Sequence, residues 1–428
     1  MKTLTLKQFI EANKKDKIKV INASKNDDLK MFKYMHAMSD WSDPIVRQAR
    51  GIVFDLITGE TVIKSFDKFF NYNQNEWMRN ISEDDEVAAT TLSSIKTKEN
   101  KQLVAELSEW PETFKQLRVY DKLDGSIMNV SVYKNELICT SSGSIDGIYP
   151  TYFKNALLNH LDDQIEKFKE KIKGKTLVFE FINPGLDPHI VDYKKNDLIL
   201  LGMFDNKTYF DYEFTNEINQ IANNFNFNQP KQYTKIKNLN DLQTLLKHLE
   251  EQETVVEGVV AVFLLLDDLI KRLKFKTPTY LKLHRQLDSI VFSPYTKANA
   301  IEIYKMFEDD IIDDLLAQYR PSNGNMQIIA YYKSLFNEHY NILNQVNQYL
   351  KENQIDVKDL DEHEKRKQVM KYIGQNYGSL GIMFVNQFYN GNDLSKIKIS
   401  ENEHLDIWFR GMIKKETEKL RKGVNRNE

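Results

Sequence analysis

The run from Lys122 to Ser126 (Lys-Leu-Asp-Gly-Ser) is the part of this chain whose residue types most directly suggest covalent chemistry. An alternating segment follows it, with Met128, Val130 and Val132 at every second position, which predicts a strand. A lysine at a junction of strand and turn suits an amine nucleophile, and Gly125 would let a phosphate approach the backbone closely. An exposed surface lysine is the alternative, and the string alone does not decide between the two.

Two carboxylates interrupt apolar segments further along the chain. Glu180 lies within residues 176–182 (Thr-Leu-Val-Phe-Glu-Phe-Ile), and Glu257 lies within residues 255–263 (Val-Val-Glu-Gly-Val-Val-Ala-Val-Phe). A buried carboxylate in the middle of a strand needs a cation, a metal or a hydroxyl as its partner. A solvent-facing position on an edge strand explains Glu180 equally well, whereas the more apolar surroundings of Glu257 favour a functional carboxylate.

Residues 273–277 (Leu-Lys-Phe-Lys-Thr) place Lys274 and Lys276 on one face of a predicted strand and Leu273 and Phe275 on the other. Two ammonium groups on one face repel each other unless an anion lies close to them. An exposed edge strand, which often carries lysines, is the alternative explanation.

Two cations near the N-terminus also adjoin strand-like or aromatic residues. Arg50 precedes the apolar run of residues 51–54, and Lys68 precedes Phe69 and Phe70. A cation beside aromatic rings suits contacts with phosphates and bases. Each of these segments taken alone is common in proteins.

The elements that must position these residues change in kind along the chain. From about residue 50 to 282 the pattern predicts strands with two interspersed helices, at 155–172 and 239–251, and therefore an α+β region with mostly antiparallel sheets. From about residue 286 onward the periodicity is helical, over residues 298–319, 327–353, 363–377 and 403–421. We therefore predict two domains, residues 1–290 and an all-α domain of residues 291–428.

Composition limits the classes of protein that fit. The chain has 428 residues and 41% hydrophobic residues, which is ordinary for globular domains. We find no run of about 18 apolar residues and no signal peptide, and therefore expect a soluble intracellular protein without a membrane anchor. With Cys139 as the single cysteine and eight scattered histidines, any metal should be bound by oxygen. The net charge of −3 means that a nucleic-acid site must be a local concentration of Lys and Arg.

The order of these segments resembles the covalent nucleotidyltransferase superfamily, and within it the RNA ligase 1 family typified by the bacteriophage ligase that repairs broken tRNA anticodon loops. The similarity runs from about residue 34 to 285. The segments that carry it are 39–41 (Ser-Asp-Trp), 49–54 (Ala-Arg-Gly-Ile-Val-Phe), 68–71 (Lys-Phe-Phe-Asn), 122–126, 143–145 (Gly-Ser-Ile), 179–181 with Ile190, Val191 and Tyr193, 257–262, and 274–276 with Tyr280 and His284.

The resemblance implies a fold: a nucleotidyltransferase domain with an ATP-grasp-like ligase core, followed by an all-helical domain that would help to select the substrate. It also implies roles for single residues. Lys122 would attack the α-phosphate of ATP, Glu180 would bind the ribose, and Glu257 would help to hold a catalytic metal. The remaining cofactor-binding residues would be Arg50, Lys68, Phe70, Asp124, Gly125, Lys274 and Lys276, and Asp313 would be an acidic residue near the metal.

The chain departs from the family pattern at Ser142. The family usually has a basic residue directly before the Gly-Ser-Ile step, whereas this chain reads Thr140-Ser141-Ser142-Gly143. One phosphate contact is then missing or supplied by another residue. The segment between Lys68 and Lys122 is also longer than the family pattern implies, which would alter RNA docking more than chemistry.

The resemblance implies an ATP-dependent RNA ligase that uses Mg²⁺, or Mn²⁺, and joins RNA 5′-phosphate and 3′-hydroxyl ends through a lysyl-AMP enzyme and an adenylylated RNA. The RNA would be a nicked tRNA whose ends a separate kinase/phosphatase has healed, and the enzyme would work as a monomer in viral or bacterial host cytoplasm. Alternatives are a DNA ligase, an mRNA capping guanylyltransferase, or a non-catalytic RNA-binding module that kept the fold. Labelled ATP against labelled GTP would distinguish the enzymes.

Overall fold

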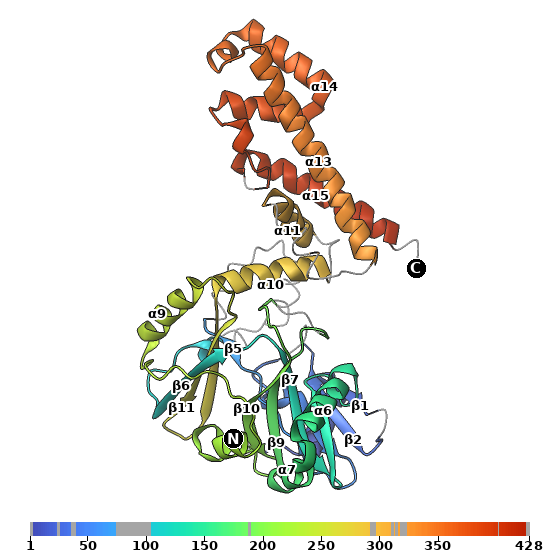
Figure 1. Cartoon of the computed structure of the whole chain (residues 1–428). Coiled ribbons are helices and arrows are strands. Elements are labelled where there is room, and N and C mark those ends of the chain that lie inside the picture. Colours follow the sequence, from blue (N-terminus) through green and yellow to red (C-terminus); the bar gives the residue numbers. More distant parts are fainter. Residues whose placement is uncertain are drawn as a thin grey trace. The chain divides into compact units, whose positions relative to one another are not determined.

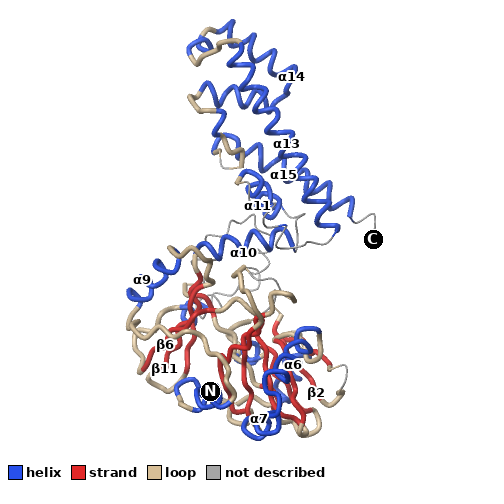
Figure 2. The backbone as a smooth tube through the Cα atoms, in the orientation of Figure 1, coloured by secondary structure: helices blue, strands red, loops and turns tan. Residues whose placement is uncertain are grey.

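The structure is a computed structural model, and it describes residues 3–23, 26–35, 40–73, 104–186, 190–291, 297–309, 312, 316, 323–400 and 402–424 (Figure 1). The chain divides into two compact units between Lys282 and Leu283. The first unit holds all of the described strands, and the second is helical (Figure 2). Over the described residues, no helix is both long and apolar enough to cross a membrane.

Three sheets of four strands form the framework of the first unit. Of the strand pairings within them, only that of β5 with β12 is parallel. In order across each sheet, the strands are β1 (Ile18–Asn22), β2 (Leu29–Tyr34), β3 (Arg50–Asp55) and β4 (Thr61–Ile63); then β10 (Asp197–Asp205), β9 (Lys175–Ile182), β7 (Ser126–Tyr133) and β8 (Glu136–Ser141); and then β5 (Phe70–Asn71), β12 (Ile270–Lys276), β11 (Gly258–Leu264) and β6 (Gln116–Lys122).

Helices cover the apolar faces of these sheets. Phe153 of α6 and Phe168 of α7 are fully buried in one core cluster with Phe179 of β9, and Leu242 of α9 is buried in another with Phe263 of β11. The helices of the first unit are α1 (Leu6–Lys14), α2 (Pro44–Gln48), α6 (Ile148–Leu161), α7 (Ile165–Ile172), α8 (Glu217–Asn224) and α9 (Leu239–Glu250), and α10 (Pro278–Val291) begins in it; short 3-10 turns lie at Asp162–Gln164 and Tyr212–Phe214.

Long helices make up the second unit, with a core of its own. Tyr304 and Phe409 lie with ring centroids 4.9 Å apart, and the Tyr304 hydroxyl is 2.9 Å from Nδ1 of His339. The elements are α11 (Lys297–Glu308), α13 (Asn323–Glu352), α14 (His363–Tyr389) and α15 (Glu403–Val424), with 3-10 turns at Lys358–Asp361 and Leu394–Lys396.

The predicted fold class is confirmed: mostly antiparallel sheets with helices, followed by a helical region. The edge-strand explanations offered for two segments are wrong. β9, which carries Glu180, lies between β10 and β7, and β12, which carries Lys274, lies between β5 and β11. Both residues therefore lie inside sheets, where a charged side chain needs a partner.

Candidate active site

Lys122, Glu257 and Lys276 meet because three neighbouring strands end at the same level. In the antiparallel register, Gly258 at the start of β11 is opposite Lys122 on one side and Lys276 on the other. Glu257, one residue earlier, is only 2% exposed. Its Oε2 accepts a hydrogen bond from Lys122 Nζ at 2.6 Å, and its Oε1 lies 2.9 Å from Lys276 Nζ. One carboxylate therefore holds both ammonium groups.

Gly258 makes this close approach of strands geometrically feasible. Its φ of +144° is a conformation that residues with a side chain rarely adopt. A Cβ atom at this position would lie 1.9 Å from the carbonyl oxygen of Phe275. Glycine is therefore required directly after Glu257, where β11 enters between β6 and β12.

The turn after Lys122 is held by the side chain of Asp124. Its Oδ2 accepts hydrogen bonds from the backbone nitrogens of Ile190, at 2.9 Å, and Val191, at 3.1 Å. Its Oδ1 accepts from the Tyr280 hydroxyl at 2.8 Å, while its own backbone nitrogen donates to the Tyr193 hydroxyl at 3.0 Å. Asp124 is thus a positioning residue, because both carboxylate oxygens already bind protein groups.

Glu180 lies beneath the same turn. It is 6% exposed, and its Oε1 accepts a hydrogen bond from the Gly125 backbone nitrogen at 2.9 Å. Burial raises the pKa of Glu180 to about 7, and the nearby carboxylates of Glu257 and Asp124 act in the same direction, whereas Lys122 opposes them. Glu180 is therefore a carboxyl group that can exchange a proton near neutral pH.

Lys274 and Arg50 approach the same aromatic ring from different strands. Lys274 Nζ lies 4.6 Å from the ring centroid of Phe69, and the guanidinium carbon of Arg50 lies 5.2 Å from it. Burial lowers the pKa of Lys274 well below its ordinary value, and the positive charges of Arg50 and Lys68 lower it further. Phe69 thus offsets part of the cost of placing cations close together.

Lys68 lies among three aromatic rings. Its Nζ is 5.5 Å from the ring centroid of Tyr34, 5.4 Å from that of Trp41 and 5.9 Å from that of Phe70. Burial lowers the pKa of Lys68 to about 8, and Arg50 and Lys276 lower it further by charge repulsion. Ring faces stabilise a cation less well than water or a carboxylate does, so an arriving anion would be strongly attracted.

The charges around this site do not balance. Within the described part of the chain, no carboxylate forms an ion pair with Arg50, Lys68 or Lys274. Fixed, partly desolvated cations without counter-ions form an anion site, and a nucleoside triphosphate is a suitable anion for so many. No group of three or more His, Cys, Asp or Glu side chains suited to a metal occurs among the residues described.

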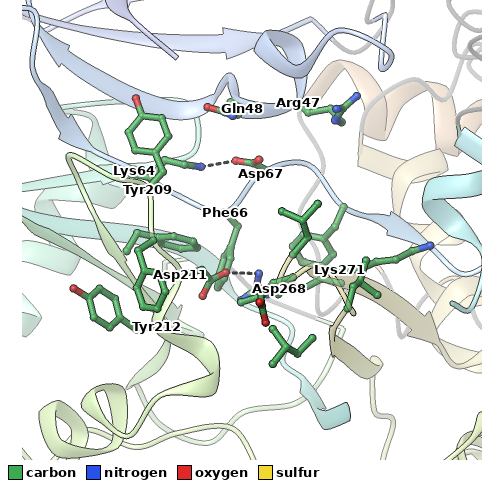
Figure 3. Close-up of a pocket in the computed structure, with 18 of the residues that line it drawn as sticks. Arg47, Gln48, Lys64, Phe66, Asp67, Tyr209, Asp211, Tyr212, Asp268 and Lys271 are labelled. Carbon is green, nitrogen blue, oxygen red and sulfur yellow. Dashed lines mark hydrogen bonds and ion pairs between the residues drawn. The ribbon is translucent and has the colours of Figure 1, made fainter. Parts of the chain in front are cut away.

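A cavity of about 1230 Å³ lies beside this cluster and includes Lys68 and Phe70 in its wall, but not Lys122 or Glu257 (Figure 3). Two of its other cations are paired: Lys64 forms an ion pair with Asp67, and Arg272 Nη1 lies 2.6 Å from Asp211 Oδ2. This cavity therefore borders the candidate site at Lys68 and Phe70 but does not include Lys122 or Glu257.

The structure places the site residues predicted from the sequence as follows. It brings together Lys122, Asp124, Gly125, Glu180, Glu257 and Lys276, and beside them Arg50, Lys68, Phe70 and Lys274. Asp313 lies outside the described residues. No role was assigned from the sequence to four aromatic residues that contact the site: Trp41, Phe69, Tyr193 and Tyr280. Each lies in or next to a motif segment, so aromatic residues beside the charged ones were the available signal.

Comparisons with known proteins identify a family for the part of the chain that contains the three sheets. A family model described as RNA ligase matches residues 48–280, which is more than half of the chain. These features define a nucleotidyltransferase-type core. The chain belongs to the RNA ligase family, and the resemblance read from its motifs is confirmed.

Individual relatives are distant. A candidate RNA ligase of Thermovibrio ammonificans is 25% identical over 318 residues, which cover 72% of this chain and 69% of that protein. A candidate bifunctional polynucleotide kinase/RNA ligase of Autographa californica nuclear polyhedrosis virus is 28% identical over 130 residues, which cover 30% of this chain and only 15% of that protein. A solved archaeal ATP-dependent RNA ligase is 13% identical, with 79% of each chain covered and a TM-score of 0.44.

Proposed function

We propose that this protein is an ATP-dependent RNA ligase in which Lys122 becomes covalently adenylylated. The observation that carries the proposal is the Glu257 carboxylate held between Lys122 and Lys276, next to cations that have no carboxylate partner among the described residues. A nucleophilic amine and an anion site lie together, which is what nucleotidyl transfer to a lysine requires.

In the first step Lys122 Nζ attacks the α-phosphorus of ATP. The nitrogen–phosphorus bond forms, the bond from that phosphorus to the bridging oxygen breaks, and pyrophosphate leaves. Glu257 Oε2 already accepts a hydrogen bond from Lys122 Nζ, so it is positioned to take the proton that the amine must lose. Lys274 and Lys276 would stabilise the negative charge that develops on the phosphates.

A divalent cation at this site would bind carboxylate oxygens, and both oxygens of Glu257 contact ammonium groups in this structure, so the cation would have to replace one of these contacts. Glu257 is the residue expected to hold the cation. The Glu180 carboxyl lies close to it, because the negative charge of Glu257 contributes to the raised pKa of Glu180. Carboxylate oxygens suit Mg²⁺ or Mn²⁺, and such an ion, when bound, neutralises phosphate charge.

In the second step the AMP passes from Lys122 to an RNA 5′-phosphate, which forms a phosphoanhydride and frees the lysine. In the third step an RNA 3′-hydroxyl attacks that 5′-phosphorus, the new phosphodiester bond forms, and AMP leaves. Family membership supports an RNA recipient. We propose a nicked tRNA as the substrate, with ends healed by a separate kinase/phosphatase, and a monomeric enzyme in viral or bacterial host cytoplasm.

The covalent step is tested with ATP labelled at the α-phosphate. Wild-type protein should carry label through a denaturing gel, label from GTP should be absent, and Lys122→Ala should carry none. Lys134→Ala is the matched control, because Lys134 pairs with Asp28 at the surface. Lys122→Ala should still seal RNA that is already adenylylated. Labelling of Lys122→Ala at the wild-type level would refute the assignment of the nucleophile.

The recipient is tested with three nicked substrates offered in parallel: an anticodon stem-loop RNA, a duplex RNA and a duplex DNA. Each carries a 5′-phosphate and a 3′-hydroxyl. We expect the stem-loop RNA to be sealed fastest. Preference for the duplex DNA would favour a DNA ligase, and sealing of none despite labelling of Lys122 would exclude these recipients.

A further inference from the structure

Lys33 lies between cationic residues of the two neighbouring strands of the first sheet. On β2 it is paired in register with Lys19 of β1 on one side and with Arg50 of β3 on the other. Lys19 and Lys33 are a regular pair and lie on the same face, where like charges repel, whereas the ladder of β2 and β3 shifts register between Phe32 and Lys33. Lys19 is exposed to water, but Lys33 is half-buried. Lys19 and Lys33 therefore repel each other, and an anion bound beside Lys33 would offset this repulsion.

Nearby lysines show what a paired cation looks like in this region. Lys17 Nζ lies 2.7 Å from Asp43 Oδ2, and Lys30 Nζ donates to Asn22 Oδ1 at 2.9 Å. The Lys33 ammonium has no such hydrogen-bond or ion-pair partner among the residues that the structure describes.

The Lys33 ammonium reaches the backbone of Gly143. A Cβ atom on Gly143 would lie 2.7 Å from Lys33 Nζ and 3.6 Å from its Cε. Any side chain at residue 143 would displace the ammonium from this place. The absence of a side chain at Gly143 and the reach of Lys33 are therefore complementary.

This position is also close to the turn that follows Lys122. β8 ends at Ser141, which pairs with Met128 near the start of β7, and the Ser142–Gly143 step lies in the turn that follows, where the Ser141 nitrogen donates to the Ser144 oxygen at 2.9 Å. The backbone of β3 closes the other side, since a Cβ atom on Gly51 would lie 3.0 Å from Ser142 Cα. Lys33 and Gly51, the residue after Arg50, thus both lie against the Ser142–Gly143 step.

We propose that Lys33 binds a phosphate group of the substrate, supplying from β2 the positive charge that Ser142 does not provide on the turn after β8. This inference rests on the proposed function and deepens it. The phosphate belongs either to ATP or to the RNA 5′ end, and the experiment separates these two sources.

The test compares full-length wild type, Lys33→Met, Lys30→Met and the double variant Lys33→Met/Ser142→Lys. Methionine keeps most of the aliphatic stem while removing the charge, and Lys30 is the control on the same strand with an exposed partner. Four quantities are measured: calorimetric binding of inorganic pyrophosphate, self-adenylylation against ATP concentration, AMP transfer to RNA with a 5′-phosphate, and sealing of adenylylated RNA.

If the phosphate belongs to ATP, Lys33→Met should weaken pyrophosphate binding and raise KM for ATP by about tenfold, the value of one charged hydrogen bond. Ser142→Lys should restore both, because it returns an amine to the same place from the neighbouring turn. A loss confined to transfer or sealing assigns Lys33 to the RNA phosphate instead.

All four quantities unchanged in Lys33→Met would overturn the inference, as would an equal loss in Lys30→Met. Failure of the proposed function looks different: the wild-type protein would then capture no AMP. In that case the affinities of wild type and Lys33→Met for pyrophosphate would still decide whether Lys33 binds phosphate. Equal affinities would count against it.

Discussion

The ammonium of Lys122 and the carboxylate of Glu257, separated by 135 residues in the sequence, lie 2.6 Å apart in the folded chain. The same carboxylate contacts Lys276 through its other oxygen. The Lys122 ammonium is held in one place by this contact, and one negative charge lies between two positive ones. The pair is therefore a structural element of the candidate site, and in the proposed function it precedes the attack on ATP.

Glu257→Gln tests both roles. Glutamine can accept a hydrogen bond but cannot balance two ammonium groups, whose side chains are 19% and 18% exposed. We expect the free energy of unfolding to fall by about 2 kcal/mol, and AMP capture to be lost. Urea denaturation and the labelling assay measure these effects. Glu166→Gln, at a surface pair in which the carboxylate is 74% exposed, should change neither.

Lys274→Met should stabilise the protein and disable it. Lys274 is a buried cation with no carboxylate partner among the described residues, and its lowered pKa shows that the fold disfavours its charged form. The gain, about 1 kcal/mol, should be largest at low pH, where the wild-type amine is charged. It should shrink as the pH rises through the lowered pKa towards 10.5. Urea denaturation at pH 6 and 9.5 measures the difference in unfolding free energy between Lys274→Met and wild type, with Lys134→Met as the control. A difference that grew with pH would contradict the prediction.

Lys68 should give ATP binding a pH dependence. Its pKa of about 8 means that the amine begins to lose its charge slightly above neutrality. The affinity for ATP should therefore fall as the pH rises through about 8. Arginine stays charged throughout this range, so Lys68→Arg should flatten the curve. Calorimetry between pH 7 and 9.5 measures the affinity for ATP, with Lys122→Ala present in both proteins to prevent turnover. The same dependence of affinity on pH with Lys68 and with Lys68→Arg would count against this role of Lys68.

Glu180 should make the stability of the ligand-free protein depend on pH. Its pKa is raised from 4.5 to about 7 in the folded state. The folded protein therefore holds the proton more tightly than the unfolded chain does, and stability falls as the pH rises from about 4.5 to 7. Glutamine does not titrate, so the variant Glu180→Gln should not lose this stability as the pH rises. The difference in the free energy of unfolding, variant minus wild type, should therefore be larger at pH 8 than at pH 5, by on the order of 3 kcal/mol at most.

Gly258→Ala should disrupt the site, because Gly258 directly follows Glu257. An added Cβ would meet the Phe275 carbonyl oxygen at 1.9 Å, so β11 and β12 must separate. We expect a loss of more than about 3 kcal/mol together with loss of AMP capture. Gly174→Ala is the control: its φ is +73° but the space around it is open, and it should cost only about 1 kcal/mol. Equal thermal shifts for the two variants would contradict the steric argument.

Several parts of this site could be read from the sequence because their signals are local. The alternation in Leu273, Lys274, Phe275 and Lys276 gave the correct two faces of β12, with Leu273 and Phe275 buried. Lys33 could not be found in this way. In the run Leu29–Tyr34 it looks like an ordinary surface lysine of a strand, and only its pairing with Arg50 and its reach to Gly143 distinguish it.

The sequence by itself determined the residue types, their order and the local alternation of strands, because these follow from the chemistry of each side chain and its immediate neighbours. Only the tertiary structure decided that Glu257 lies between Lys122 and Lys276, and that Asp124 is occupied by backbone nitrogens. Strand register depends on packing between segments far apart in the chain. The pKa values of Glu180 and Lys68 likewise depend on burial and on charges brought close by folding, and no single segment contains that information.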